Sequence, residues 1–211
     1  MKLSKNEVAK KVHECAVIYK ENLLGKNVLF LSLNENKISD YFECLFLARN
    51  FQHLTGVSSA ITGANFFHAA LNSRLSENNL WLEKDGTTEL KLSILKKLMN
   101  IHLTARMIGD YDNSKTYLVT DKLAGTVTGA MGFIEDNGYY VPNTVLKEDL
   151  RNLSFAPRQR VLATFIKSQN DKFYTELSYA ITDNTILTDD ILGTLYEKVD
   201  FTNLNLKSAQ F

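Results

Sequence analysis

The stretch that decides the fold runs from Tyr41 to Val57 and reads YFECLFLARNFQHLTGV. Its first half is apolar, whereas its second half gathers a guanidinium, an amide, an imidazole and a hydroxyl, followed by a glycine that lets the backbone turn. The apolar half is either a strand that leads into a short helix or part of one continuous helix, because periodicity does not separate the two in so short a run. In both cases the polar half is the most chemically varied segment of the chain.

His53 is the residue of this stretch best suited to acid–base chemistry. Histidine changes its charge near neutral pH, so it can accept and donate a proton. Thr55, two residues further on, is the candidate hydrogen-bonding neighbour of the imidazole. In the alternative interpretation the stretch is core alone: Phe51 and Leu54 belong to an apolar helix face, and His53 points sideways into water.

Outward from this stretch, the first half of the chain predicts helices and one strand. Ser4 and Glu7 form a capping-box pattern that opens a helix ending near Gly25, and 27–33 is a compact apolar strand. Apolar residues at spacings of three and four predict helices over 62–71 and from 87 to about 102.

Short strand-like segments separated by Gly, Asn and Asp turns fill the second half, over 107–110, 117–120, 126–134, 139–146, 161–167 and 173–181. Asp136-Asn137-Gly138 and the segment 168–171 are hairpin turns in this interpretation. The prediction is an α+β fold in which N-terminal helices pack against a mostly antiparallel sheet formed by the second half. With no repeat and no flexible linker, 1–211 is expected to be a single domain with an acidic C-terminal tail from about 183 to 211.

Composition limits where a polyanion could bind. Of the 211 residues, 45% are hydrophobic, which suffices for a full core, and 24 basic residues balance 24 acidic ones. A chain without net charge has no overall field that would hold nucleic acid or an anionic membrane, so any such site must be local. The segment 147–172 is the one locally basic region, and it contains the candidate nucleic-acid-binding residues Arg158, Arg160 and Lys167.

The cysteines and the apolar runs bear on the compartment. Cys15 and Cys44 have ordinary hydrophobic neighbours and no framework spacing, so both are expected to be buried and reduced, as in the cytoplasm. The N-terminus lacks the apolar core of a signal peptide, and no run approaches the roughly 20 apolar residues that cross a bilayer. We expect a cytoplasmic protein with no membrane partner.

Residues 50–57, NFQHLTGV, resemble the NFxHLTGV signature of a phage-borne group of barnase-, EndoU-, colicin- and RelE-like nucleases. The similarity runs from about Lys26 to about Ile181. Further segments support it in the same order: Lys91-Leu92, 108–111, 120–125, Gly132-Phe133 and 140–151. The resemblance implies a nuclease-like fold in a phage or prophage accessory protein that acts in the cytoplasm of a host bacterial cell.

RNA cleavage is the activity that this resemblance implies. Cleavage without a metal needs a base, an acid, and cations or amides around the phosphate. His53 and Thr55 are the candidate acid–base and hydrogen-bonding residues, and Lys147 and Arg151 are the candidate catalytic cations. Barnase-like sites often add a glutamate or a second histidine, but no motif or spacing marks such a partner here. No cofactor is required for this chemistry.

Two alternatives stay open. A zinc ion is one possible cofactor, with His53 and His68 as its ligands, although paired ligand spacings such as C-x-x-C are absent. The other alternative is a non-enzymatic inhibitor of a host defence complex, such as an anti-CRISPR protein that binds a CRISPR effector nuclease. A neutral chain with an acidic tail suits a protein or ribonucleoprotein partner as well as it suits RNA. Neither the substrate nor the oligomeric state follows from the sequence.

Overall fold

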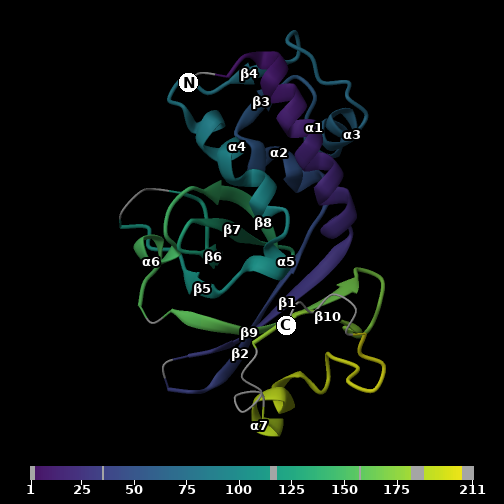
Figure 1. Cartoon of the computed structure of the whole chain (residues 1–211), viewed down its shortest axis with the longest axis vertical. Coiled ribbons are helices and arrows are strands. Elements are labelled where there is room, and N and C mark those ends of the chain that lie inside the picture. The colour runs from purple at the N-terminus through teal and green to yellow at the C-terminus, as the bar shows by residue number, and fades with distance from the viewer. Residues whose placement is uncertain (1–2, 35, 115–117, 157, 182–187, 206–211) are drawn as a thin grey trace.

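The fold is given by a computed structural model that describes residues 3–34, 36–114, 118–156, 158–181 and 188–205 (Figure 1). The helices are α1 (Lys5–Asn22), α2 (Phe51–Thr55), α3 (Gly63–Leu71), α4 (Thr87–Leu98), α5 (Ile101–Thr104), α6 (Leu150–Leu153) and α7 (Asp189–Leu192), with 3-10 turns η1 (Ala48–Asn50) and η2 (Gly193–Leu195). The strands are β1 (Lys26–Leu33), β2 (Ser39–Leu45), β3 (Val57–Ser59), β4 (Leu80–Leu82), β5 (Met107–Asp110), β6 (Lys122–Thr126), β7 (Gly129–Asp136), β8 (Tyr139–Leu146), β9 (Gln159–Ser168) and β10 (Glu176–Ala180).

Eight of these strands form one sheet in the order β1-β2-β8-β7-β6-β5-β9-β10. Because β1 also pairs with β9, seven of them close into a ring, and β10 extends from the outer side of β9. The neighbours pair antiparallel except β2 and β8, which run parallel and meet at Cys44 and Tyr140. The predicted α+β class with a mostly antiparallel sheet is confirmed. The sheet is not confined to the second half, however, since β1 and β2 belong to the first.

A helical layer covers one end of the ring, and the second part of the stretch 41–57 belongs to it as η1 and α2 (Figure 1). The strand β2 runs directly into η1 and α2, so the strand-then-helix alternative is the correct one. Tyr19 of α1 holds the layers together: its ring lies against Phe46, Phe51 and Phe67, and its hydroxyl donates to the Leu47 carbonyl at 2.9 Å. The predicted capping box of α1 is present, with Ser4 and Glu7 bonded reciprocally.

Several predicted boundaries shift. The strand expected over 126–134 is interrupted by the turn from β6 to β7, and β7 begins only at Gly129. The strand expected over 117–120 is not found at 118–120, residue 117 lies outside the described residues, and β6 occupies 122–126 instead. The helix expected from 87 to about 102 ends at Leu98, and α5 follows as a separate turn. The hairpin at 136–138 is confirmed: Asn137 and Gly138 both have positive φ, as the tight turn between β7 and β8 requires.

The C-terminal segment 188–205 folds back onto the outer side of β1, β9 and β10. Leu195 and Val199 are buried in one cluster with Leu29, Leu162 and other apolar residues of these strands. Within the acidic tail, Glu197 is exposed, whereas Asp183 and the side chain of Asp189 lie outside the described residues. The described part of this tail is therefore packed against the ring.

Cys15 and Cys44 are both buried and unpaired, as predicted. Burial raises the pKa of the Cys15 thiol to about 12 and that of Cys44 well above its usual value, so neither thiol is a ready nucleophile. None of the helices in the described parts of the chain combines the length and the apolar character needed to cross a membrane.

The burial of His102 in α5 predicts that the free energy of unfolding decreases in acid. Burial, and then the charge of Lys26, lower the pKa of His102 to about 4 in the folded protein, whereas an unfolded histidine takes up its proton near pH 6.5. Between these values the unfolded chain binds more protons, so lowering the pH from 6.5 to 4 should cost roughly 3 kcal/mol, and raising it above 6.5 should change nothing through this group.

Urea unfolding at a series of pH values measures this loss. The variant His102→Gln cannot charge, so its stability should fall less over the same interval, and the difference between the two curves isolates the histidine from the carboxylates. Parallel curves for the two proteins would contradict the assignment to His102.

Candidate functional site

Two adjoining hollows share His53. The β3 hollow, about 430 Å³, is lined by Gln52, His53, Gly56, Val57, Ser58, Ser59, Thr62, Gly63 and Glu83. The β8 hollow, about 410 Å³, is lined by Arg49, Asn50, His53, Gly63, Ile134, Asp136, Val141 and Asn143. The exposed His53 therefore stands between them and borders both, together with Gly63.

The helical period of α2 turns His53 toward solvent. Phe51 and Leu54 are fully buried in the core shared by the helices and the ring, which leaves the position between them facing outward. The interpretation of this helix as an apolar core face and its interpretation as the carrier of a functional histidine are therefore compatible. Burial of one face of α2 leaves the imidazole exposed on the other face.

Thr55 has a different role from the predicted one. Its side chain is fully buried, and its hydroxyl donates to the Gln52 carbonyl at 2.7 Å and accepts from the Val57 N–H at 3.1 Å. Gly56 follows with φ at +64°, where a Cβ would lie 2.9 Å from Lys91 Cδ. Thr55 and Gly56 therefore form the turn after α2, and the glycine lets α4 pack closely against it.

Helix α4 fixes this turn and connects it to Glu83. The Thr88 hydroxyl donates to the Gly56 carbonyl and accepts from the Glu83 N–H at 3.0 Å, and Lys91 Nζ donates to the His53 carbonyl at 3.0 Å. Burial lowers the pKa of Lys91, and the negative charge of Glu83 opposes that shift. The two motif segments, HLTG and Lys91-Leu92, are thus in direct contact.

Glu83 is an acidic residue of the β3 hollow that no sequence motif marked. Its carboxylate lines the β3 hollow with His53, and Ser58 Oγ donates to Glu83 Oε1 at 2.9 Å. Glu83 reaches this position because β3 and β4 pair antiparallel and place it just beyond the end of β4. The sequence would have indicated Glu83 only if 57–59 and 80–82 had been recognised as paired strands. Both strands are too short to show the alternation of apolar and polar residues that marks a strand.

A cation and two amide side chains line the β8 hollow. Arg49 forms an ion pair with Asp136 at 2.6 Å, and its side chain stays 54% exposed. Asn50 is buried, and its Oδ1 has no hydrogen-bond partner among the described residues. Two hydrogen bonds hold the Asn143 amide: Thr120 Oγ1 donates to its Oδ1 at 3.0 Å, and its Nδ2 donates to the Val119 carbonyl.

The close packing of neighbouring segments explains why residue 132 is a glycine. A Cβ there would lie 2.8 Å from the methyl groups of Thr120 and Thr144, so only glycine allows the segments on either side to meet. Three of the segments that carry the family resemblance therefore converge behind Asn143.

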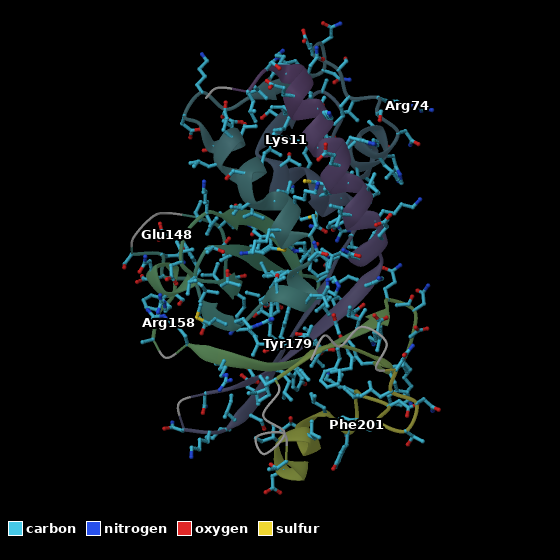
Figure 2. The ribbon with its side chains drawn as sticks, in the orientation of Figure 1. Lys11, Arg74, Glu148, Arg158, Tyr179 and Phe201 are labelled. Carbon is cyan, nitrogen blue, oxygen red and sulfur yellow. The ribbon has the colours of Figure 1, made fainter. Side chains whose placement is uncertain are left out.

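The predicted catalytic cations do not line either hollow. Lys147 is exposed beyond the end of β8, and Arg151 on α6 forms an ion pair with Asp149 at 2.6 Å. That bond holds the pKa of Asp149 below its usual value. Glu148 and Arg158 lie at α6 on the flank of the ring, away from the helical layer that carries His53 (Figure 2).

The predicted nucleic-acid-binding residues are dispersed. The guanidinium of Arg158 is held by hydrogen bonds to nearby residues of the chain, because it donates to Ser154 Oγ at 3.1 Å and to the Arg151 carbonyl. Arg160 and Lys167 lie on β9 seven residues apart, which is about 23 Å along a strand. Lys167 Nζ also donates to the Lys172 carbonyl at 3.2 Å. The structure does not gather these three residues with His53.

His68, the other candidate zinc ligand, is exposed on α3 with its ring against Phe67 at 5.5 Å. Over the residues that the structure describes, no three His, Cys, Asp or Glu side chains gather closely enough to hold a metal ion.

The Thr88 bonds carry a testable consequence. Thr88→Val keeps the size of the side chain but removes the donor to Gly56 and the acceptor of the Glu83 N–H, both at a fully buried position. Losing these bonds should lower the free energy of unfolding by about 2 kcal/mol, measured in urea. Ser93→Ala, at an exposed position of the same helix, should change it by less than about 0.5 kcal/mol. Equal effects of the two substitutions would contradict the role of Thr88.

The site thus consists of a histidine, a carboxylate and an arginine around one pair of hollows in an α+β fold. The family model described as phage-Barnase-EndoU-ColicinE5/D-RelE like nuclease4 (PBECR4) matches residues 11–183, so the chain belongs to this family. No curated protein and no solved structure gives a significant match. The match ends before the C-terminal segment 188–205.

Proposed function

We propose that the protein is a metal-independent endoribonuclease whose centre is His53. The observation that carries this proposal is the position of His53 between two hollows, with Glu83 on one side and Arg49 on the other. A single-stranded RNA crossing His53 would meet an acid, a base and a cation within one continuous surface. These are the groups that phosphodiester cleavage requires.

In the proposed reaction, Glu83 and His53 exchange protons with the RNA. The Glu83 carboxylate removes the proton of a ribose 2′-hydroxyl, and the 2′-oxygen attacks the neighbouring phosphorus. The bond from phosphorus to the 5′-oxygen breaks, and the His53 imidazolium gives that oxygen its proton. The products are a 2′,3′-cyclic phosphate and a 5′-hydroxyl, and no metal ion takes part in any step.

Arg49 is the cation proposed for the phosphate. Its guanidinium is half exposed and lies on the wall of the β8 hollow, where it already binds the Asp136 carboxylate. A guanidinium can bind two phosphate oxygens at once, so an incoming phosphate can exchange with the carboxylate. Asn143, which Thr120 and Val119 position through hydrogen bonds, adds an amide to the same wall.

Incubation of the purified full-length chain with labelled single-stranded RNA and a metal chelator tests the proposal. Cleavage should leave 2′,3′-cyclic phosphate ends, and a strand with 2′-deoxyribose at every position should stay intact because it lacks the attacking hydroxyl. Intact RNA, or equal cleavage of the deoxy strand, would overturn the proposal. In the first case, binding to a host defence complex becomes the function to test.

A further inference from the structure

The only tryptophan of the chain, Trp81, pairs with Ser58, a residue that lines the β3 hollow. It is the middle residue of β4, directly opposite Ser58 of β3, and the residue as a whole remains 49% exposed. In an antiparallel pair, residues directly opposite one another point to the same face and have Cβ atoms about 5 Å apart. The indole is therefore next to Ser58.

The two faces of this small sheet differ in character. Leu80 is fully buried and Leu82 packs against the same core, so the face that carries them is turned inward. Trp81 and Ser58 occupy the opposite face, because side chains alternate along a strand. Glu83 reaches that face too, as the bond from Ser58 Oγ to its carboxylate shows. One exposed face thus combines a carboxylate of the proposed site with an indole ring.

Trp81 is half exposed, and its indole makes no ring or cation contact among the described residues. By contrast, Tyr41, Phe173, Tyr174 and Tyr179 each have a lysine or arginine above the ring. Stacking of a nucleobase on an aromatic side chain contributes about 1–3 kcal/mol per base and tolerates any base, because every base has a π face.

We propose that Trp81 stacks on a base of the RNA strand bound in the β3 hollow, and so acts as a positioning residue for the nucleotide next to the scissile phosphate. The nature of the ligand rests on the proposed function. A stacked base must be free of its own helix, so the site takes single-stranded RNA and disfavours duplex RNA.

Because Trp81 is the sole tryptophan, the fluorescence of the unmodified protein reports on this position alone when it is excited at a wavelength that the nine tyrosines do not absorb. The probe is a short single-stranded RNA with 2′-O-methyl riboses, which cannot be cleaved through the 2′-oxygen. Its addition should quench the tryptophan emission in a saturable way. A strand with the same backbone but abasic positions should leave the emission unchanged, because phosphate and ribose do not stack.

Variants measure the energetic contribution. Trp81→Ala should weaken binding of a fluorophore-labelled strand by about 5- to 150-fold, and Trp81→Phe should retain most of the affinity. In the cleavage assay, Trp81→Ala should raise KM more than it lowers kcat. Phe155, exposed to 53% on the turn after α6, supplies the matched control, and Phe155→Ala should bind as the unchanged protein does. Thermal unfolding of each variant checks that it is folded.

Stacking and cleavage can fail separately. Base-dependent quenching in a protein that leaves RNA intact supports the stacking site and overturns the catalytic proposal alone. RNA cleavage with no base-dependent quenching, and with equal affinity for Trp81→Ala, overturns the stacking site alone.

Discussion

The substitution His53→Ala is expected to lower the rate of RNA cleavage by about 10²- to 10⁴-fold, the usual contribution of a positioned general acid or base. The exposed imidazole contributes little to the core, because Phe51 and Leu54 bury the other face of α2. The variant should therefore fold as the unchanged protein does. Single-turnover cleavage of labelled RNA measures the rate, and urea unfolding measures the stability.

His68→Ala is the matched control. His68 is also an exposed histidine on a helix of the same layer, but it lines neither hollow. Its substitution should leave the cleavage rate unchanged. If the two alanine variants cleave at the same rate, His53 is not the acid or base. If His53→Ala has also lost several kcal/mol of stability, its lower rate reports a folding defect.

Local patterns predicted most of the elements, because each depends on neighbours in the chain. The capping box of Ser4 and Glu7 marks the start of α1, and Asn137-Gly138 marks the β7–β8 turn through its positive φ angles. The HLTG segment of the resemblance spans the end of α2 and its Gly56 cap. In each case a few adjacent residues decide the local backbone.

What the sequence did not predict depends on contacts between distant segments. The ring closes through pairing of β1 with β9, which lie more than a hundred residues apart, and strand patterns carry no information about such partners. Glu83 lines the same hollow as His53 only because β3 pairs with β4. Conversely, Arg158, Arg160 and Lys167 are near one another in the sequence, but an extended strand separates the last two.

Gly125→Ala should lower the free energy of unfolding by roughly 4 kcal/mol, an unusually large effect for one methyl group. An ideal Cβ at Gly125 would lie 2.4 Å from the Gly129 carbonyl oxygen and 2.7 Å from Ala130 Cα. Both are backbone atoms of β7, the partner of β6, so no side-chain rotation can relieve the clash. The β6–β7 hairpin would have to open.

The position of this hairpin makes such an opening costly. Strand β6 pairs with β5 on its other side and β7 pairs with β8, so a shift within the hairpin disturbs a ring that is closed by pairing. Urea unfolding of Gly125→Ala measures the loss. Gly193→Ala is the control, because its Cβ would meet only Tyr196 Cε2 at 3.9 Å, an ordinary contact. It should change stability by less than about 0.5 kcal/mol. Similar losses for the two variants would show that β6 and β7 do not approach so closely.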